Sequence, residues 1–263
     1  MITSFIGCRS GPKVAARTLL VLAVICLSCG APPHPQKLSI AAAADLNFAM
    51  QDIATKFRAV HPAVQVDVAY GSSGNFFAQI GNRAPFDIFL SADVEYPRKL
   101  SAAGFGAGTP VFTYAVGRLV VWVPAASPLD PALALRDPSL KHLAIANPQH
   151  APYGRAAQAA LQSLGLYQGL QPKLVLGENI SQTLQFVESG AADAGIVALS
   201  LALAPPVRAR GRYWEIPADQ YPRMEQGGII LKDSMSANDF RDFLLSGGGR
   251  RILKQYGFFV PAE

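Results

Sequence analysis

The stretch Leu38-Ser39-Ile40-Ala41-Ala42-Ala43-Ala44-Asp45-Leu46 decides the fold that this sequence predicts. Its first half is small and apolar, which indicates a buried strand, and its second half opens a helix with Asp45 at the cap. Where a strand turns into a helix, several backbone N–H groups are unpaired, and the helix dipole adds about half a positive charge. Such a junction attracts anions without a Lys or Arg. Every parallel α/β protein has several of these junctions, so the functional question is whether others converge with this one.

Strands and helices alternate along the chain after this stretch. Apolar residues at helical spacing predict a helix over 45–60, and alternating residues predict a strand over 64–70. The same order continues through a strand at 87–90 and a helix that ends at Gly104, which favours a parallel sheet with helices on its faces. The β-rich run 111–123 is long enough to leave that sheet and enter a second one.

A second α/β series follows, with strands and helices predicted at 142–146, 153–164, 173–176, 181–189 and 194–198. A strand near 224–231 is expected to return to the first lobe, and two closing helices are expected at 239–245 and 250–256. The sequence therefore predicts an α/β protein of two lobes, each a mostly parallel sheet flanked by helices, with the ligand cleft between them. The expected division is an export signal and tether over 1–35, lobe 1 over 36–115 and 223–263, and lobe 2 over 116–222.

The N-terminal segment has the features of an export signal, because basic residues precede the apolar run 19–27 and small residues follow it. This run is too short to remain in a bilayer as a spanning helix. All three cysteines lie in this segment, so no disulfide is expected in the mature protein. Leu27-Ser28-Cys29-Gly30 resembles a bacterial lipoprotein processing site, at which Cys29 would be lipidated; simple cleavage is the alternative. Both outcomes place the protein in the periplasm or on the outer face of the cytoplasmic membrane.

The charge balance does not favour a nucleic-acid partner. The net charge of +5 falls to +2 without Arg9, Lys13 and Arg17 of the leader, which has no acidic residue. No basic run with interleaved aromatic residues is present. The basic patches at 208–212 and 250–251 are more typical of solvated surface than of a polyanion site.

Three further strand–helix junctions have the character of the first. They are Gly71-Ser72-Ser73-Gly74, the segment 147–154 with Tyr153, and the segment 178–182, whose Ile180 amide would point out of a helix start. All four lie at carboxyl ends of strands, two in each lobe, where the ligands of open α/β sheets bind. Their convergence predicts an anion site between the lobes. The alternatives are that the serines are ordinary helix caps and that Tyr153 only packs.

The residues that carry enzyme chemistry show no convincing arrangement. The four histidines are not closely paired, and His150 is the only one beside a candidate site, where a position on the rim is expected. No nucleophile elbow, Walker loop or GxGxxG motif is present. Asp87, Asp93 and Glu95 cluster at a strand–helix joint, where cap and surface roles are more probable than a catalytic pair. We therefore expect neither catalysis nor a cofactor.

With these residues in hand, the chain resembles the periplasmic molybdate-binding proteins of ABC importers over nearly all of 37–263. The resemblance rests on the order and spacing of several modest motifs: Ala-Ala-Ala-Asp-Leu at 42–46, Gly-Ser-Ser-Gly at 71–74 with Ala-Gln-Ile at 78–80, 84–93, 112–117, 144–148, 151–154, Glu178-Asn179 and Gly257-Phe258.

This resemblance implies a type II periplasmic-binding fold that closes over a tetrahedral dianion, molybdate and also tungstate. It implies that hydroxyls and backbone amides bind the anion, and that molybdenum or tungsten enters only as the oxyanion. Carried over by position, the contacts are Ala44, Asp45, Ser73, Tyr153 and the amide of Ile180. The implied partner is the membrane permease of an ABC importer, with the binding protein acting as a monomer.

Ala44 and Asp45 depart from the family pattern, in which Ser or Thr is common at the first position and Asn or Ser occurs at the second. Ala44 can offer only its amide, and a carboxylate aimed at a dianion would repel it. We therefore expect Asp45 to turn back as a helix cap and to contribute only its N–H. Two alternatives stay open: a binding protein for another oxyanion or a small carboxylate, and a periplasmic enzyme on the same fold.

Overall fold

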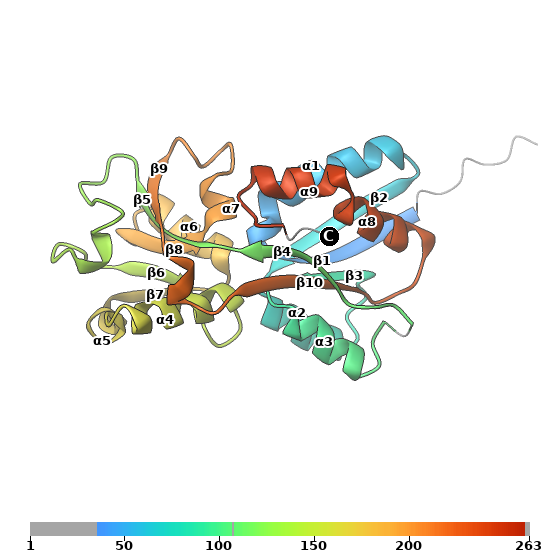
Figure 1. Ribbon diagram of the computed structural model, residues 1–263, viewed down its shortest axis with the longest axis horizontal. Helices are drawn as coiled ribbons and strands as arrows, with labels where there is room; N and C mark the ends of the chain where they lie inside the picture. Colours follow the sequence, from blue (N-terminus) through green and yellow to red (C-terminus); the bar gives the residue numbers. More distant parts are fainter. Residues whose placement is uncertain (1–35, 107, 261–263) are drawn as a thin grey trace, which may run out of the picture. The chain divides into compact units, whose positions relative to one another are not determined.

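The computed structural model describes residues 36–106 and 108–260, and two five-stranded sheets carry its fold (Figure 1). The first sheet has the order β2-β1-β3-β10-β4. Its strands are β1 (Gln36–Ala43), β2 (Val64–Gly71), β3 (Ile88–Ser91), β4 (Phe112–Gly117) and β10 (Met224–Ile230). β1 pairs in parallel with β2 and β3, and β10 pairs antiparallel with β3 and β4, so only β10 runs against the other strands.

The second sheet has the order β7-β6-β8-β5-β9. Its strands are β5 (Leu119–Pro124), β6 (Leu143–Ala146), β7 (Leu174–Gly177), β8 (Ala194–Ala198) and β9 (Gly211–Glu215). β6 is parallel to β7 and β8, whereas β5 is the reversed strand between β8 and β9. The predicted two-lobed architecture with mostly parallel sheets is therefore confirmed. The expectation that the run 111–123 passes from one sheet into the other is also confirmed, because β4 and β5 are separated only by Arg118.

Helices cover the sheets on both faces. The helices beside the first sheet are α1 (Asn47–Val60), α2 (Ser73–Gly81), α3 (Glu95–Ala102), α8 (Met235–Leu245) and α9 (Gly247–Gln255). Those beside the second are α4 (Pro152–Ser163), α5 (Tyr167–Leu170), α6 (Ile180–Glu188) and α7 (Leu199–Ala202). Single 3-10 turns lie at Ala44–Leu46, Ala134–Arg136, Gln171–Lys173 and Ala218–Gln220.

The alternation of side chains along β1 separates two cores. Ile40 faces the core that contains Phe57 of α1 and Phe240 of α8, while Ala41 faces a smaller cluster with Phe76 of α2. Figure 1 shows the same separation, with α1, α8 and α9 on one side of the first sheet and α2 and α3 on the other. This packing fixes the end of β1 and the start of α2 relative to each other.

The sheets determine how the lobes can be divided. β4 belongs to the first sheet as far as Gly117, two residues beyond the predicted end of the first segment of lobe 1. We therefore propose the same division into lobes with this crossover placed at Arg118. The export signal, the tether and Cys29 lie outside the described residues. Within the part of the chain that is described, no helix combines the length and the apolar character needed to cross a membrane.

Candidate anion-binding site

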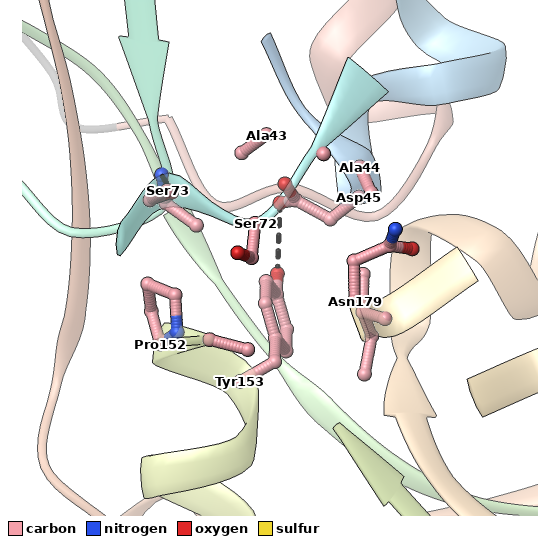
Figure 2. A pocket seen from close by; sticks show the side chains of 12 residues that line it. Ala43, Ala44, Asp45, Ser72, Ser73, Pro152, Tyr153 and Asn179 are labelled. Atoms are coloured by element: carbon pink, nitrogen blue, oxygen red, sulfur yellow. Dashed lines mark hydrogen bonds between the residues drawn. The ribbon is translucent and has the colours of Figure 1, made fainter. Parts of the chain in front are cut away.

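The five residues that the sequence singled out line one pocket between the lobes (Figure 2). Four strand–helix junctions contribute to it, and its lining is Ala43, Ala44, Asp45, Gly71, Ser72, Ser73, Ala92, Ala151, Pro152, Tyr153, Asn179 and Ile180. The cavity volume is about 10 Å³, against about 300 Å³ in a neighbouring cleft. A cavity this small has no room for a sugar or a peptide.

Helix starts give the pocket an electropositive lining without a cation. Ser73 is the first residue of α2, Ile180 the first of α6 and Tyr153 the second of α4, so their N–H groups have no acceptor within their own helices. The positive ends of three helix dipoles accompany these groups. None of the twelve lining residues is Lys or Arg. The lining can therefore hold an anion through N–H and O–H donors.

Ser72 and Ser73 have different roles. Ser72 is the N-cap of α2, where its Oγ accepts from Asn75 N–H, and it also contacts His150 Nδ1 at 3.0 Å. Ser73 is 1% exposed, and its Oγ accepts from Ala92 N–H at 3.0 Å. Because that bond uses an oxygen lone pair, the hydroxyl proton of Ser73 stays available as a donor.

The expectation that Asp45 caps a helix is wrong. The N-cap of α1 is Leu46, and no side chain forms a cap bond there. The Asp45 carboxyl group instead reaches across the site, where its Oδ2 accepts from the Tyr153 hydroxyl at 3.0 Å and from Gln226 Nε2 at 2.6 Å. The physical reason is that Asp45 lies in a 3-10 turn before α1, where its side chain is 1% exposed and meets donors from two other elements.

Burial dominates the electrostatics of this carboxyl group. It raises the pKa of Asp45 to about 6, although the side chains of Gln226 and Tyr153 and, to a smaller extent, the backbone N–H groups of Asp45 and Leu46 favour the charged form. The pKa of the Tyr153 hydroxyl is raised well above its ordinary value, first by burial and then by the charge of Asp45. Asp45 Oδ1 and Gln226 Oε1 are buried and have no hydrogen-bond partner. The site thus contains a carboxyl group that holds a proton more readily than an exposed one.

Gln226 is a site residue that sequence reasoning missed. It lies in β10 beside a register shift, is fully buried, and donates both to Asp45 and to the Tyr153 hydroxyl at 3.2 Å. The signal in the sequence was a single amide side chain within a run of residues that otherwise predicts a buried strand. Gly117 of β4 leaves room for this cluster, because a Cβ there would collide with the Tyr153 hydroxyl and lie 2.8 Å from Gln226 Nε2.

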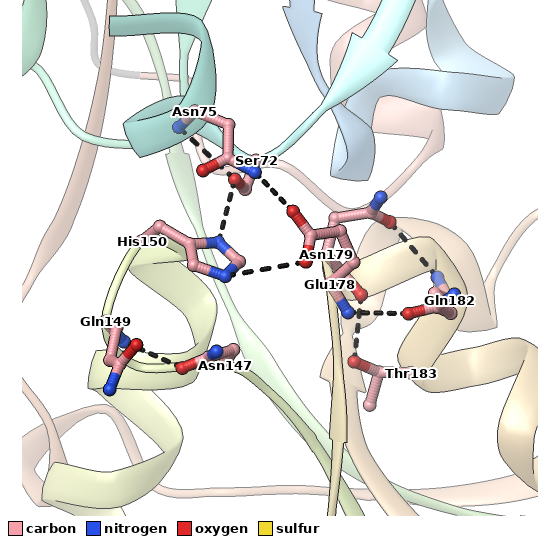
Figure 3. Close-up of polar contacts among 9 residues, drawn as sticks. All are labelled: Ser72, Asn75, Asn147, Gln149, His150, Glu178, Asn179, Gln182 and Thr183. Carbon is pink, nitrogen blue, oxygen red and sulfur yellow. Dashed lines mark hydrogen bonds and ion pairs between the residues drawn. The ribbon is translucent and has the colours of Figure 1, made fainter. Parts of the chain in front are cut away.

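Hydrogen bonds across the rim join the two lobes (Figure 3). His150, on the loop before α4, contacts Ser72 through Nδ1 and Glu178 through Nε2 at 3.6 Å, which fits the expected rim position. Glu178 also accepts from Asn75 of α2. Gly74 N–H donates to His150 O at 2.9 Å, so two backbones meet directly at this point.

Two more hydrogen bonds between the lobes hold the strand–helix junction at Ala44 and Asp45 in place. The Ser181 hydroxyl of α6 donates to Ala44 O at 2.9 Å, and the Ser200 hydroxyl of α7 donates to Asp45 O at 2.8 Å. Ser181 therefore is not the ordinary helix cap that was the alternative for it, since Asn179 caps α6. Arg155 Nη2 of α4 pairs with Asp93 Oδ2 at 2.7 Å farther along the cleft.

The acidic cluster near β3 serves structural contacts. Asp87 Oδ2 accepts from Ser39 N–H, and Asp93 accepts from Glu95 N–H in addition to its pairing with Arg155. Over 36–106 and 108–260, no group of three or more His, Cys, Asp or Glu side chains is placed to hold a metal ion.

Comparisons with known proteins agree with this geometry. The family model of the bacterial extracellular solute-binding proteins matches residues 38–259. A molybdate-binding protein of Azotobacter vinelandii is 37% identical over 249 residues, which cover 92% of this chain and 97% of that protein. A molybdate-binding protein of Rhodobacter capsulatus is 39% identical over 196 residues, covering 73% and 77% of the two chains. The solved structure of the periplasmic molybdate-binding protein of A. vinelandii superposes with a TM-score of 0.79 at 33% identity, covering 86% of this chain and all of that one.

Proposed function

This chain belongs to the family of bacterial extracellular solute-binding proteins, and on that premise we propose that it captures molybdate between its lobes and delivers it to an ABC permease. The observation that carries the proposal is the convergence of four strand–helix junctions on one small pocket that has N–H and O–H donors and no Lys or Arg. Two curated relatives that bear the name molybdate-binding protein support the choice of ligand.

Molybdate suits such a lining because it is a compact tetrahedral dianion whose four oxygens all accept hydrogen bonds. Under this proposal the amides of Ala44, Asp45 and Ile180, the hydroxyl of Ser73 and the side chain of Tyr153 surround it. Tungstate has the same charge and shape, so the site accepts it as well. The metal arrives only within the oxyanion, the protein needs no cofactor, and its role is binding rather than catalysis.

Binding shifts the equilibrium between open and closed lobes, because the closed state supplies donors from both. The permease then distinguishes the loaded closed form from the open one. We further propose that the protein works as a monomer outside the cytoplasmic membrane, either lipidated at Cys29 or cleaved and soluble.

Calorimetric titration of the purified protein with molybdate, tungstate, sulfate and phosphate tests the proposal. We expect sub-micromolar binding of molybdate and tungstate, with sulfate inert. Absence of binding for both metal oxyanions would overturn it. Tight binding of phosphate or of a small carboxylate in their place would keep the family but change the ligand.

A further inference from the structure

The carboxyl group of Asp45 has one oxygen that the protein leaves unused. Oδ2 accepts two hydrogen bonds, whereas Oδ1 is buried without a partner, and the residue lines the pocket (Figure 2). A buried acceptor without a donor costs about 1–3 kcal/mol, and more when it is charged. Because Asp45 lines the pocket, a ligand or a proton is a candidate to complete this oxygen.

Two acceptors cannot bond to each other without a proton between them. An oxygen of a fully ionised oxyanion and an ionised Asp45 Oδ1 would repel, and no Lys or Arg lines the pocket to separate them. One proton on Oδ1 turns this repulsion into a charge-assisted O–H···O bond. Because molybdate brings no proton at neutral pH, the proton has to come from solvent through the protein.

We propose that Asp45 binds the oxyanion as a neutral carboxylic acid that donates its Oδ1–H to a ligand oxygen, so that each dianion captured is accompanied by one proton. The step forms one O–H bond on Asp45, takes the proton from solvent and leaves the dianion unchanged. This inference rests on the proposed molybdate function, and it makes Asp45 the residue that couples affinity to pH.

The surroundings of Asp45 support this assignment. Tyr153 faces it from α4, Tyr114 from β4 and Gln226 from β10, while the Ser200 hydroxyl of α7 binds its backbone oxygen. Burial raises the pKa of both tyrosines well above the ordinary value, so they remain protonated near neutrality.

His150 and Glu178 are further titratable groups near the pocket; His150 lies beyond Ser72 on the rim, where it meets Glu178. Among the described residues, the influences on the Asp45 carboxyl group are burial and hydrogen bonds, with no cation among them. Burial already raises its pKa to about 6 without a ligand, and a bound dianion favours the neutral form further.

Titration calorimetry in two buffers of different ionisation enthalpy measures the proton directly. We expect uptake of close to one proton per molybdate at about pH 7.5, and an affinity that falls about tenfold per pH unit from about pH 7 to 8.5.

Asp45→Asn is the matched variant, since its amide carries a permanent donor and its oxygen can still accept from Tyr153 and Gln226. It should bind molybdate with no proton uptake and no pH slope. His150→Gln, the control on the rim, should keep the proton uptake.

The outcomes separate this inference from the proposed function. Molybdate binding to the wild type without proton uptake overturns the role of Asp45 and leaves the function standing, and this measurement needs no variant. Failure of the wild type to bind either metal oxyanion from about pH 5.5 to 8.5 overturns the function itself. Tight phosphate binding without proton uptake would show the reverse arrangement, an ionised Asp45 that accepts a proton carried by the ligand, and would overturn both. Uptake that disappears in His150→Gln would assign the proton to the histidine instead.

Discussion

The Tyr153 hydroxyl of α4 donates to Asp45 Oδ2 at 3.0 Å across 108 residues of sequence. The two residues belong to different lobes, and both line the pocket. A single hydrogen bond thus joins the carboxyl group of Asp45 in one lobe to the start of α4 in the other.

The ionised form of Asp45 should lower the stability of the unliganded protein at neutral and alkaline pH. Its folded pKa of about 6 exceeds the ordinary 3.8, so the native state binds the proton more tightly than the unfolded state. The contribution of the neutral carboxyl group to the free energy of unfolding is fully present below about pH 4. It is lost as the pH rises through about 6. Asp45→Asn should thus raise the free energy of unfolding by about 3 kcal/mol at about pH 8, with the gain shrinking at lower pH. Urea unfolding at several pH values measures this difference; a gain that is the same at acid and alkaline pH would contradict it.

Ser73→Ala should weaken molybdate binding by about ten- to a hundredfold, the value of a hydrogen bond to a charged ligand. Ser73 Oγ already accepts from Ala92 N–H, which directs its proton elsewhere. Titration calorimetry measures the affinity, and Ser234→Ala serves as the control with unchanged affinity, because Ser234 caps α8 and does not line the pocket. The control should lose about 1 kcal/mol of stability. An unchanged affinity in Ser73→Ala would remove its hydroxyl from the ligand set.

The sequence predicted the fold well because its signals are local. Apolar spacing located α1 and the strand β10, and the length of the run 111–123 revealed the passage between sheets. The strand β9 was missed because its residues, which include Arg212, are mostly exposed or half-buried at the edge of a sheet. Its pairing with β5 is a tertiary contact that no short pattern reports.

The sequence could predict which positions line the site, but not which of their side chains form hydrogen bonds with one another. Helix-start chemistry singled out Ser73, Tyr153 and Ile180, which line one pocket, while their contact with a ligand stays a prediction. The orientation of the Asp45 side chain was predicted wrongly, because it depends on Gln226, a residue 181 positions away that donates to it. Which partner a buried carboxyl group finds is decided by tertiary packing rather than by its own helix.

Gly74→Ala should oppose closure of the lobes. Its N–H donates to His150 O, and a Cβ at this position would collide with that oxygen and lie 2.9 Å from His150 Cα. Because the obstacle is backbone of the opposite lobe, we expect affinity for molybdate to fall at least about tenfold, the effect of about 1.4 kcal/mol, while the unliganded fold keeps its stability. Gly81→Ala in the same helix is the control, since a Cβ there meets nothing within 4 Å. Calorimetry and thermal unfolding together test this; equal affinities for the two variants would show that closure tolerates the methyl group.

Arg155 of α4 and Asp93, in the segment between β3 and α3, form an ion pair between the lobes that should slow release of the ligand. Arg155 Nη2 lies 2.7 Å from Asp93 Oδ2, and Nη1 donates to the Tyr96 hydroxyl at 3.0 Å. Both charged side chains are partly exposed, so the pair is worth at most about 1 kcal/mol and is screened by salt. Because the pair joins the two lobes, separating them would break it, so Arg155→Gln should raise the dissociation rate of molybdate about two- to fivefold and reduce its dependence on salt.

Arg98→Gln is the matched control for this pair, because Arg98 pairs with Glu95 within α3 and touches one lobe only. A chase of radiolabelled molybdate by excess unlabelled molybdate, at low and high salt, measures the dissociation rate for each protein. The control should match the wild type at both salt concentrations. If Arg155→Gln releases molybdate no faster than Arg98→Gln, the closed state is held by the buried contacts at Asp45, Ala44 and Gly74 alone, and the ion pair only accompanies closure.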